Sequence, residues 1–176
     1  MNMDKEFAIA RLVQECYGTG HLENLIPMLA DDYYAHHSIG LADVIFGKEA
    51  ASEYYIRKGK AVRKAGGRNN TMLVRISRVA ICPFEWTSCD GETVLNPHFI
   101  VWGLSGQICV LVEQEVSKDE WIRFLIVPWI DNDGKLFTLF LNYPDSYELE
   151  PLEEWHRNSY SDDETVRSFP QQKDRS

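Results

Sequence analysis

Two adjacent histidines, His36 and His37, are the residues whose type and position most readily suggest chemistry. They end a short segment, residues 33–37, that we expect to form a strand. Imidazole has an unperturbed pKa of about 6.5, so it can accept or donate a proton near neutral pH. Successive side chains of a strand point to opposite faces, so only one of the two can enter a cavity. Proton transfer by that histidine competes with the simpler interpretation that both are partly exposed at a strand end.

A third histidine, His98, lies in residues 93–102, which also have the composition of a strand. Alternation places it on one face with Asn96 and Trp102. A face that mixes polar and aromatic side chains suits a ligand pocket, which is mostly apolar with a few polar groups. Two alternatives remain open: a core histidine bonded to a carbonyl, or an exposed one, because Pro97 is typical of an edge or a bulge.

Two carboxylates, Glu113 and Glu115, alternate along residues 107–116 and would share one face of a strand. If both were buried, desolvation and mutual repulsion would raise a pKa and provide an acid catalyst. The alternative is the solvated side of a sheet. Aromatic residues, Trp129 among them, could line a pocket for a flat ligand or simply form core and interface contacts.

Other classes of function are disfavoured by composition and spacing. The formal charge of -9 argues against nucleic acid as a partner, and the one basic run, residues 57–64, fits the solvated face of a helix. No histidine or cysteine spacing typical of a metal site occurs, and no nucleophile elbow or phosphate loop, so we expect no metal and no cofactor. The four cysteines form no C-x-x-C pair and are expected to be reduced.

Composition and the first residues also indicate where the protein is located. No apolar run approaches the roughly 20 residues of a membrane span, so we expect no membrane partner. The first residues lack the basic start and apolar centre of a secretory signal. We therefore expect a cytoplasmic protein.

Helices come first in the chain and strands follow. Apolar residues recur with helical spacing over residues 4–17 and 21–30 and again over 47–64. The pattern then changes to β-branched and aromatic segments separated by turns, at residues 72–82, 93–102, 107–116, 121–130 and 136–143. This order predicts an α+β fold, in which three N-terminal helices cover a cone-shaped, curved antiparallel sheet.

Domain organisation is simple. We expect one domain over residues 1–147 and an acidic C-terminal extension over residues 148–176. The last 10 to 15 or so residues are too polar to offset the entropy of ordering, so their disorder is expected.

Several motifs, taken in order, resemble the nuclear transport factor 2-like superfamily, which includes steroid Δ-isomerases, scytalone dehydratase and SnoaL-like polyketide cyclases. They are found at residues 20–25, 29–32, 40, 47–55 and 129–136. The resemblance covers about residues 4–143. It implies the cone fold, a cavity for a small apolar or aromatic ligand, and homodimers formed through the outer sheet face.

The resemblance implies a fold more firmly than it implies an activity. Steroid isomerases place a general base a few residues after the Ala-Asp-Asp motif, and ungapped matching puts His37 there. Their oxyanion hole needs two hydrogen-bond donors. The matched positions hold Val13 and Ile126, which cannot donate, so steroid isomerisation is not expected. Scytalone dehydratase moves protons with histidine, tyrosine and asparagine side chains, types that this chain also has but at unmatched positions.

The sequence thus predicts a small-molecule-binding cone-fold protein, with no decision on whether it is an enzyme. In an enzyme, a cofactor-free isomerase, dehydratase or cyclase, His37 would be the general base and His98 a second proton carrier. Tyr33 or Tyr143 would supply a positioning hydroxyl, and the expected ligand-binding residues are Tyr33, Asn96, Trp102, Trp129 and Tyr143. The competing interpretation is a non-catalytic interaction or ligand-sensing module of the same fold.

Overall fold

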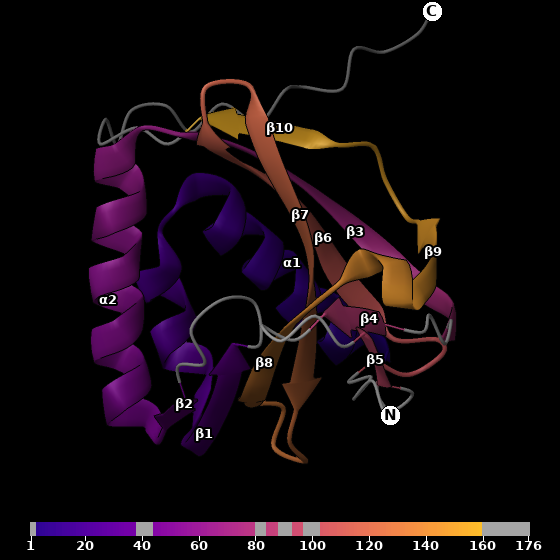
Figure 1. Cartoon of the computed structure of the whole chain (residues 1–176). Coiled ribbons are helices and arrows are strands. Elements are labelled where there is room, and N and C mark those ends of the chain that lie inside the picture. Colours follow the sequence, from indigo (N-terminus) through magenta and orange to yellow (C-terminus); the bar gives the residue numbers. More distant parts are fainter. Residues whose placement is uncertain (1–2, 38–43, 80–83, 88–92, 97–102, 160–176) are drawn as a thin grey trace, which may run out of the picture.

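The fold is α+β, with helices on one side of a twisted sheet (Figure 1). The structure, a computed structural model, describes residues 3–37, 44–79, 84–87, 93–96 and 103–159. The helical elements are α1 (Met3–Thr19), the 3-10 helix η1 (Leu22–Met28), α2 (Lys48–Ala65) and the 3-10 turn η2 (Pro144–Ser146). The strands are β1 (Leu29–His37), β2 (Val44–Phe46), β3 (Arg68–Val79), β4 (Phe84–Thr87), β5 (Thr93–Asn96), β6 (Ile108–Ser117), β7 (Glu120–Ile130), β8 (Leu136–Asn142), β9 (Tyr147–Pro151) and β10 (His156–Ser159).

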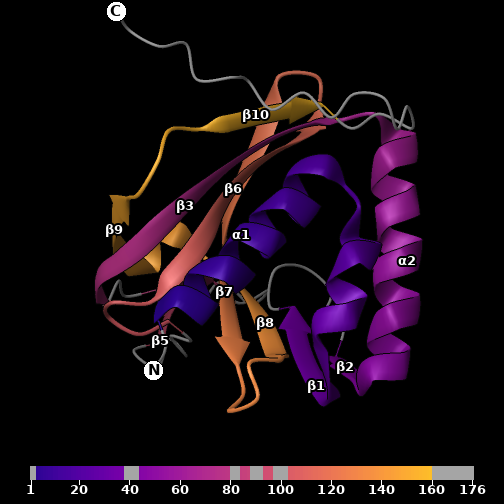
Figure 2. The same cartoon turned by 180° about the vertical axis from the view of Figure 1, so that it is seen from behind.

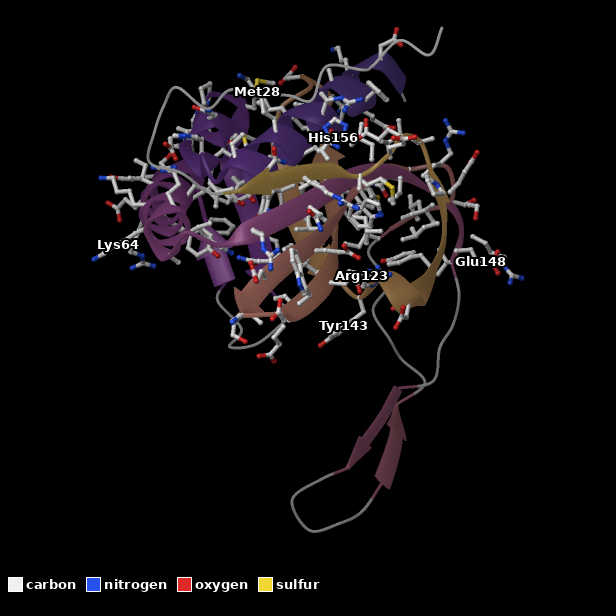
Figure 3. All side chains as sticks on the ribbon, turned by 90° about the horizontal axis from the view of Figure 1, so that it is seen from above. Met28, Lys64, Arg123, Tyr143, Glu148 and His156 are labelled. Carbon is white, nitrogen blue, oxygen red and sulfur yellow. The ribbon has the colours of Figure 1, made fainter. Side chains whose placement is uncertain are left out.

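One large sheet organises the described residues. Its order is β10-β3-β6-β7-β8-β1-β2, and β9 also pairs with β3. Neighbours are antiparallel except β1 and β8, which run parallel, so the sheet is mixed and mostly antiparallel. The short β4–β5 hairpin pairs with neither edge of this sheet and stands apart from it (Figure 3).

The helices cover the inner, concave face of the sheet (Figure 2). The buried residues of α1 are spaced at intervals of three and four, so one stripe of the helix meets β3 and β6. The cluster that results contains Ile9, Val13, Tyr17, Tyr33, Tyr55, Leu73, Val110, Ile126 and Leu139. The expected arrangement of three N-terminal helices on a curved sheet is therefore confirmed.

The outer face of the sheet carries a second buried cluster. Its members are Met72, Val74, Ile76, Cys109, Leu111, Leu125, Val127, Phe140 and Tyr147. Their side chains are at least nine-tenths buried in a single chain. A homodimer formed through this face remains a prediction, and these residues have little further apolar surface to contribute to it.

Expected element boundaries hold for the long elements and shift for the short ones. The segment expected as a second helix is a 3-10 helix that ends at Met28, and the strand after it begins at Leu29 instead of Tyr33. The loop expected over residues 38–46 ends in the edge strand β2. No helix within the described residues combines the length and apolar composition needed to cross a membrane.

Part of the acidic extension belongs to the sheet. Both β9 and β10 pair with the same edge of β3, beyond the expected boundary at residue 147. That boundary stays a prediction, and the end expected to be disordered lies outside the described residues. In Figure 3, Glu148 marks β9 and His156 marks β10, which pair with different parts of this edge.

Glu153 fills the gap between these two added strands. Its Oε1 accepts a hydrogen bond from the backbone N–H of Leu73 at 3.0 Å, where β3 has no strand partner on that side. The same carboxylate accepts from Gln14 and, at 2.6 Å, from Arg11, both on α1. The side chain of Glu153 thereby joins the extension, the sheet edge and the first helix.

These contacts set the ionisation of Glu153. Burial alone would raise its pKa, but the hydrogen bonds from Leu73, Gln14 and Arg11 outweigh burial and lower the pKa below its usual value. A carboxylate with a lowered pKa contributes stability above its unfolded-state pKa, and that stability is lost as the pH falls through the folded-state pKa. His156 Nε2, 3.5 Å from Oε1, is the other titratable group recorded beside it.

We expect Glu153→Gln to lower the free energy of unfolding at pH 7 by about 1 to 3 kcal/mol, because hydrogen bonds to a charged group are lost. The difference between wild type and variant should shrink as the pH is lowered from 5 toward 3. Urea unfolding at each pH measures it, with the exposed neighbour substitution Glu154→Gln as control. A difference that is constant with pH would contradict the assignment.

Candidate ligand-binding site

A cavity of about 130 Å³ lies between the helices and the inner face of the sheet, and we call it the cone cavity. Six elements (α1, η1, α2, β6, β7 and β8) and the turn after α1 contribute to it. Its lining consists of Tyr17, Gly20, Leu22, Lys58, Val62, Gln114, Ile122, Phe124 and Leu141. It opens near Ile122, whose side chain is 40% exposed at the β6–β7 end of the sheet.

The lining is mainly apolar with three polar side chains from different elements. Tyr17 comes from the end of α1, Lys58 from α2 and Gln114 from β6. Such a combination is typical of small-molecule sites, in which apolar contacts supply affinity and a few polar groups fix orientation.

A close contact between α2 and the turn after α1 forms one wall of the cone cavity. A Cβ on Gly59 would lie 2.9 Å from the backbone oxygen of Gly20, so only glycine allows the helix to approach this far. Gly20 itself has a φ of 77°, a conformation that favours glycine. Arg63 closes the contact by donating to the Gly20 carbonyl at 2.7 Å and to Glu23 at 3.1 Å.

Glu23 is held as an anion in this turn. Burial would raise its pKa, but its backbone hydrogen bond and those from His21 and Arg63 lower it instead. The 3.0 Å contact to His21 Nδ1 and the 3.1 Å contact to Arg63 account for both carboxylate oxygens. Glu23 therefore stabilises the turn after α1 through its contacts to His21 and Arg63.

Lys58 is connected to the core by a row of tyrosines. Its Nζ donates to Tyr54 Oη at 3.0 Å and lies 5.4 Å from the centre of that ring. The rings of Tyr54 and Tyr55 are 5.3 Å apart, and those of Tyr55 and Tyr33 are 6.2 Å apart. The row fixes the position of the ammonium on α2 relative to β1.

Tyr33, expected to bind ligand, lies in the core. Its side chain is fully buried, and its hydroxyl is 2.6 Å from that of Tyr55. Burial raises the pKa of both phenols far above the ordinary value, so both are neutral donors and acceptors. The contact attaches α2 to β1, and Tyr33 is not part of the cone cavity lining given above.

Trp129, another expected ligand-binding residue, lines a second cavity of about 290 Å³ at the start of α1. The lining also includes Lys5, Glu6, Leu104, Gln107 and Asp131. Two hydrogen bonds hold the side chain of Gln107. Its Nε2 donates to the backbone oxygen of Pro128 at 2.8 Å, and its Oε1 accepts from the backbone N–H of Leu104 at 3.0 Å. The two cavities share no lining residue among those described.

The remaining expected site residues are not among those that line the cone cavity, and two of them lie outside the residues that the structure describes. Tyr143 is 40% exposed and follows β8, and Figure 3 shows it at the molecular surface. His37 ends β1 and is the register partner of Leu141, which lines the cone cavity. Asn96 ends β5 opposite Phe84, whereas His98 and Trp102 lie outside the described residues. The catalytic and binding roles of all these residues stay predictions.

Glu113 and Glu115 are half-buried on the outer face of the sheet and form ion pairs. Glu113 accepts a hydrogen bond from Arg123. Glu115 forms a bidentate ion pair with Arg68, with hydrogen bonds of 2.6 and 2.7 Å. The hydrogen bonds from Arg68 lower the pKa of Glu115 to about 2. This shift is opposite to the one an acid catalyst requires.

Metal and thiol chemistry gain no support within the described part of the chain. It contains no group of three histidine, cysteine or carboxylate side chains placed to hold a metal ion. Cys16 and Cys109 are free and buried, and burial raises the pKa of the Cys16 thiol to about 12.

Sequence reasoning did not select the three polar residues of the cone cavity. Gln114 had a usable signal, because alternation puts it on the inner face of β6 with Val110 and Val112. A polar residue on an apolar face is a candidate for a pocket. Lys58 had none, since it falls within the basic run assigned to a solvated helix face.

Comparisons with known proteins add limited information. No family model matches the chain, and no curated protein matches it. Among the solved structures that match is a Delta 5-3-ketosteroid isomerase from Mycobacterium sp., with 16% sequence identity and a TM-score of 0.44. The match covers 82% of this chain and 98% of that chain.

We expect Tyr55→Phe to destabilise the fold by about 1 to 3 kcal/mol, because it leaves the buried Tyr33 hydroxyl without its 2.6 Å partner. The double variant Tyr33→Phe/Tyr55→Phe should cost less than the sum of the two single variants, since both polar groups are removed together. Denaturant unfolding of the four proteins measures the coupling. Additive single effects would show that the hydroxyls do not interact.

Proposed function

We propose that the protein is a member of the nuclear transport factor 2-like superfamily that binds a small apolar or aromatic molecule in the cone cavity. The observation that carries the proposal is the lining itself, where five apolar side chains meet Tyr17, Lys58 and Gln114. The apolar members are Leu22, Val62, Ile122, Phe124 and Leu141. The α+β architecture, with helices over a curved sheet, is consistent with membership.

The size of the cavity limits the ligand. Its volume of about 130 Å³ is close to the roughly 150 Å³ of an apolar cavity that holds one benzene molecule. A four-ring steroid needs several times that space, because drug-sized ligands occupy sites of about 300 to 1,000 Å³. The proposed ligand therefore has a single ring or a short branched chain. This agrees with the absence of donors at Val13 and Ile126, both of which are fully buried apolar residues.

We further propose that this site is catalytic. His37 would be the general base of a cofactor-free proton transfer, and His98 the second proton carrier. Support for His37 comes from its register with Leu141, a lining residue. The enzyme would be of the isomerase, dehydratase or cyclase type and would act in the cytoplasm.

A non-catalytic ligand sensor is the second candidate, and one observation favours it. The described residues that line the cone cavity include no histidine and no carboxylate, although a proton-transfer enzyme needs a base beside the ligand. Both candidates share the same binding step. They differ in whether His37 contacts the ligand.

Val62→Trp tests the binding step. The larger side chain would occupy much of the cavity, so a panel of single-ring compounds such as toluene and phenol should no longer raise the melting temperature. For wild type, a ligand at about 100 times its Kd should add about 2.7 kcal/mol to stability. The control is Ala61→Trp, at the exposed neighbouring position on α2. Failure of every panel member to stabilise the wild type would refute the proposal.

His37→Ala separates the two candidates. If His37 contacts the ligand, this variant should bind about tenfold more weakly than wild type, which thermal shift against ligand concentration measures. His36→Ala is the matched control, because it removes the neighbouring imidazole of the same strand. Equal stabilisation of all three proteins would remove His37 from the site and leave the sensor interpretation.

A further inference from the structure

We propose that the ligand of the cone cavity carries a neutral group with N–H donors, a carboxamide or a lactam, and that the side-chain amide of Gln114 recognises this group. The inference rests on the proposed function and extends it to the polar group of the ligand. Three observations support it: the position of Gln114 at the mouth of the cavity, the row of amide side chains to which it belongs, and a buried amide oxygen in that row to which no described residue donates.

Gln114 lies where the cavity opens. It is the register partner of Ile122 on the neighbouring strand β7, and Ile122 is the exposed residue beside the mouth. The side chain of Gln114 is itself half-buried and lines the cavity. Within the described part of the chain, its amide makes no hydrogen bond to another residue. One carbonyl oxygen and two N–H donors are therefore available to a ligand at this place.

Gln114 also ends a row of amide side chains that crosses three strands. Asn158 on β10 is paired in register with Asn69 on β3, and Asn69 is paired with Gln114 on β6. Directly opposed residues of antiparallel strands have Cβ atoms about 4.5 to 5.5 Å apart. The end of α1 lies on this row, since a Cβ on Gly18 would be 2.7 Å from Nδ2 of Asn158. The row is therefore covered by the helix at one end and reaches the cavity at the other.

The middle amide of the row has an oxygen that needs a donor. The side chain of Asn69 is 1% exposed, and its Nδ2 donates to the backbone oxygen of Tyr17 at the end of α1. A backbone oxygen only accepts, so this contact fixes which end of the amide is the nitrogen and which is the oxygen. No described residue donates to the buried Oδ1 of Asn69. Buried polar atoms in proteins nearly always have a hydrogen-bond partner, so this part of the wall is short of donors.

The amide of Gln114 is suited to connect this oxygen to a ligand. Rotation of its side chain lets one N–H donate to Asn69 Oδ1 in the neighbouring strand, and its second N–H then donates to a ligand carbonyl. The Oε1 of Gln114 accepts an N–H from the same ligand. Hydrogen bonds joined in such a chain polarise and strengthen one another. A ligand that only accepts would leave Oε1 without a donor.

The apolar contacts orient the ligand in the same way. Leu22, Phe124 and Leu141 are at least nine-tenths buried, whereas Gln114 and Ile122 are partly exposed. A ligand with one ring and one carboxamide would place the ring among the buried residues and the carboxamide at the mouth. A hydrogen-bonded neutral amide costs far less to bury than an ion does, so the half-buried position suits this group.

Benzamide and acetophenone form a test pair, because they share a ring and a carbonyl and differ by an amino group in place of a methyl group. We expect wild type to bind benzamide at least about tenfold more tightly than acetophenone, since only benzamide supplies N–H donors. Gln114→Met keeps the length of the side chain but removes the amide. Acetophenone should therefore bind this variant at least as tightly as benzamide does. Titration calorimetry measures these affinities.

Two further variants serve as comparisons. Gln114→Glu keeps oxygens that accept from an N–H, so it should retain the preference for benzamide. Val116→Met, at an exposed position of the same strand outside the cavity lining, should behave as wild type. Should Gln114→Met fail to fold, Gln114→Leu provides the same comparison, and the preference of wild type is measured without any variant.

The outcomes distinguish the two proposals. If acetophenone or toluene binds wild type as tightly as benzamide, the inference about N–H donors is overturned while the proposed function stands. A benzamide preference that survives in a folded Gln114→Met variant overturns the inference as well. If none of the three compounds binds, the proposed function itself is wrong.

Discussion

The close approach of α2 to the turn after α1 is the constraint on which the cone depends. At Gly59 the helix lies so near the Gly20 carbonyl that a methyl group would not fit. Arg63, only 11% exposed, then bonds the same carbonyl and locks the distance. Because α2 cannot move outward or inward at this point, the gap between the helix and β7 is fixed. That gap is the cone cavity.

The same contact explains why one basic segment has two roles. A helix places residues three and four apart on one side, so Tyr55, Gly59 and Arg63 share the stripe that faces the sheet and the turn. Lys58 and Val62 flank that stripe and reach the cavity, while Lys60 and Lys64 remain in solvent. Figure 3 shows Lys64 at the outer end of α2, away from the sheet.

Periodicity in the sequence determined the long elements but could not reveal contacts between distant segments. Helix α1 was predictable because its apolar residues repeat with helical spacing, and strands β6 to β8 were predictable because they are rich in β-branched and aromatic residues and are separated by turns. The strands β9 and β10 were not, since their acidic residues look solvated and Glu153 is satisfied by residues 80, 139 and 142 positions away. Tyr33 and Lys58 show the same limit: Tyr33, predicted to bind ligand, is fully buried beside Tyr55, and Lys58, assigned to a solvated helix face, lines the cone cavity. Their environments depend on the packing of α2, which local sequence does not encode.

The interior tyrosines link stability to ligand choice. Tyr33 and Tyr55 are fully buried and their hydroxyls satisfy one another at 2.6 Å, so opening this part of the core for a larger ligand would leave buried hydroxyls unpaired. The space that remains is at the mouth, between α2 and the end of β7. A ligand confined there meets Lys58 together with Phe124 and cannot avoid either. The row of tyrosines therefore both closes the interior and positions Lys58 on the cavity wall.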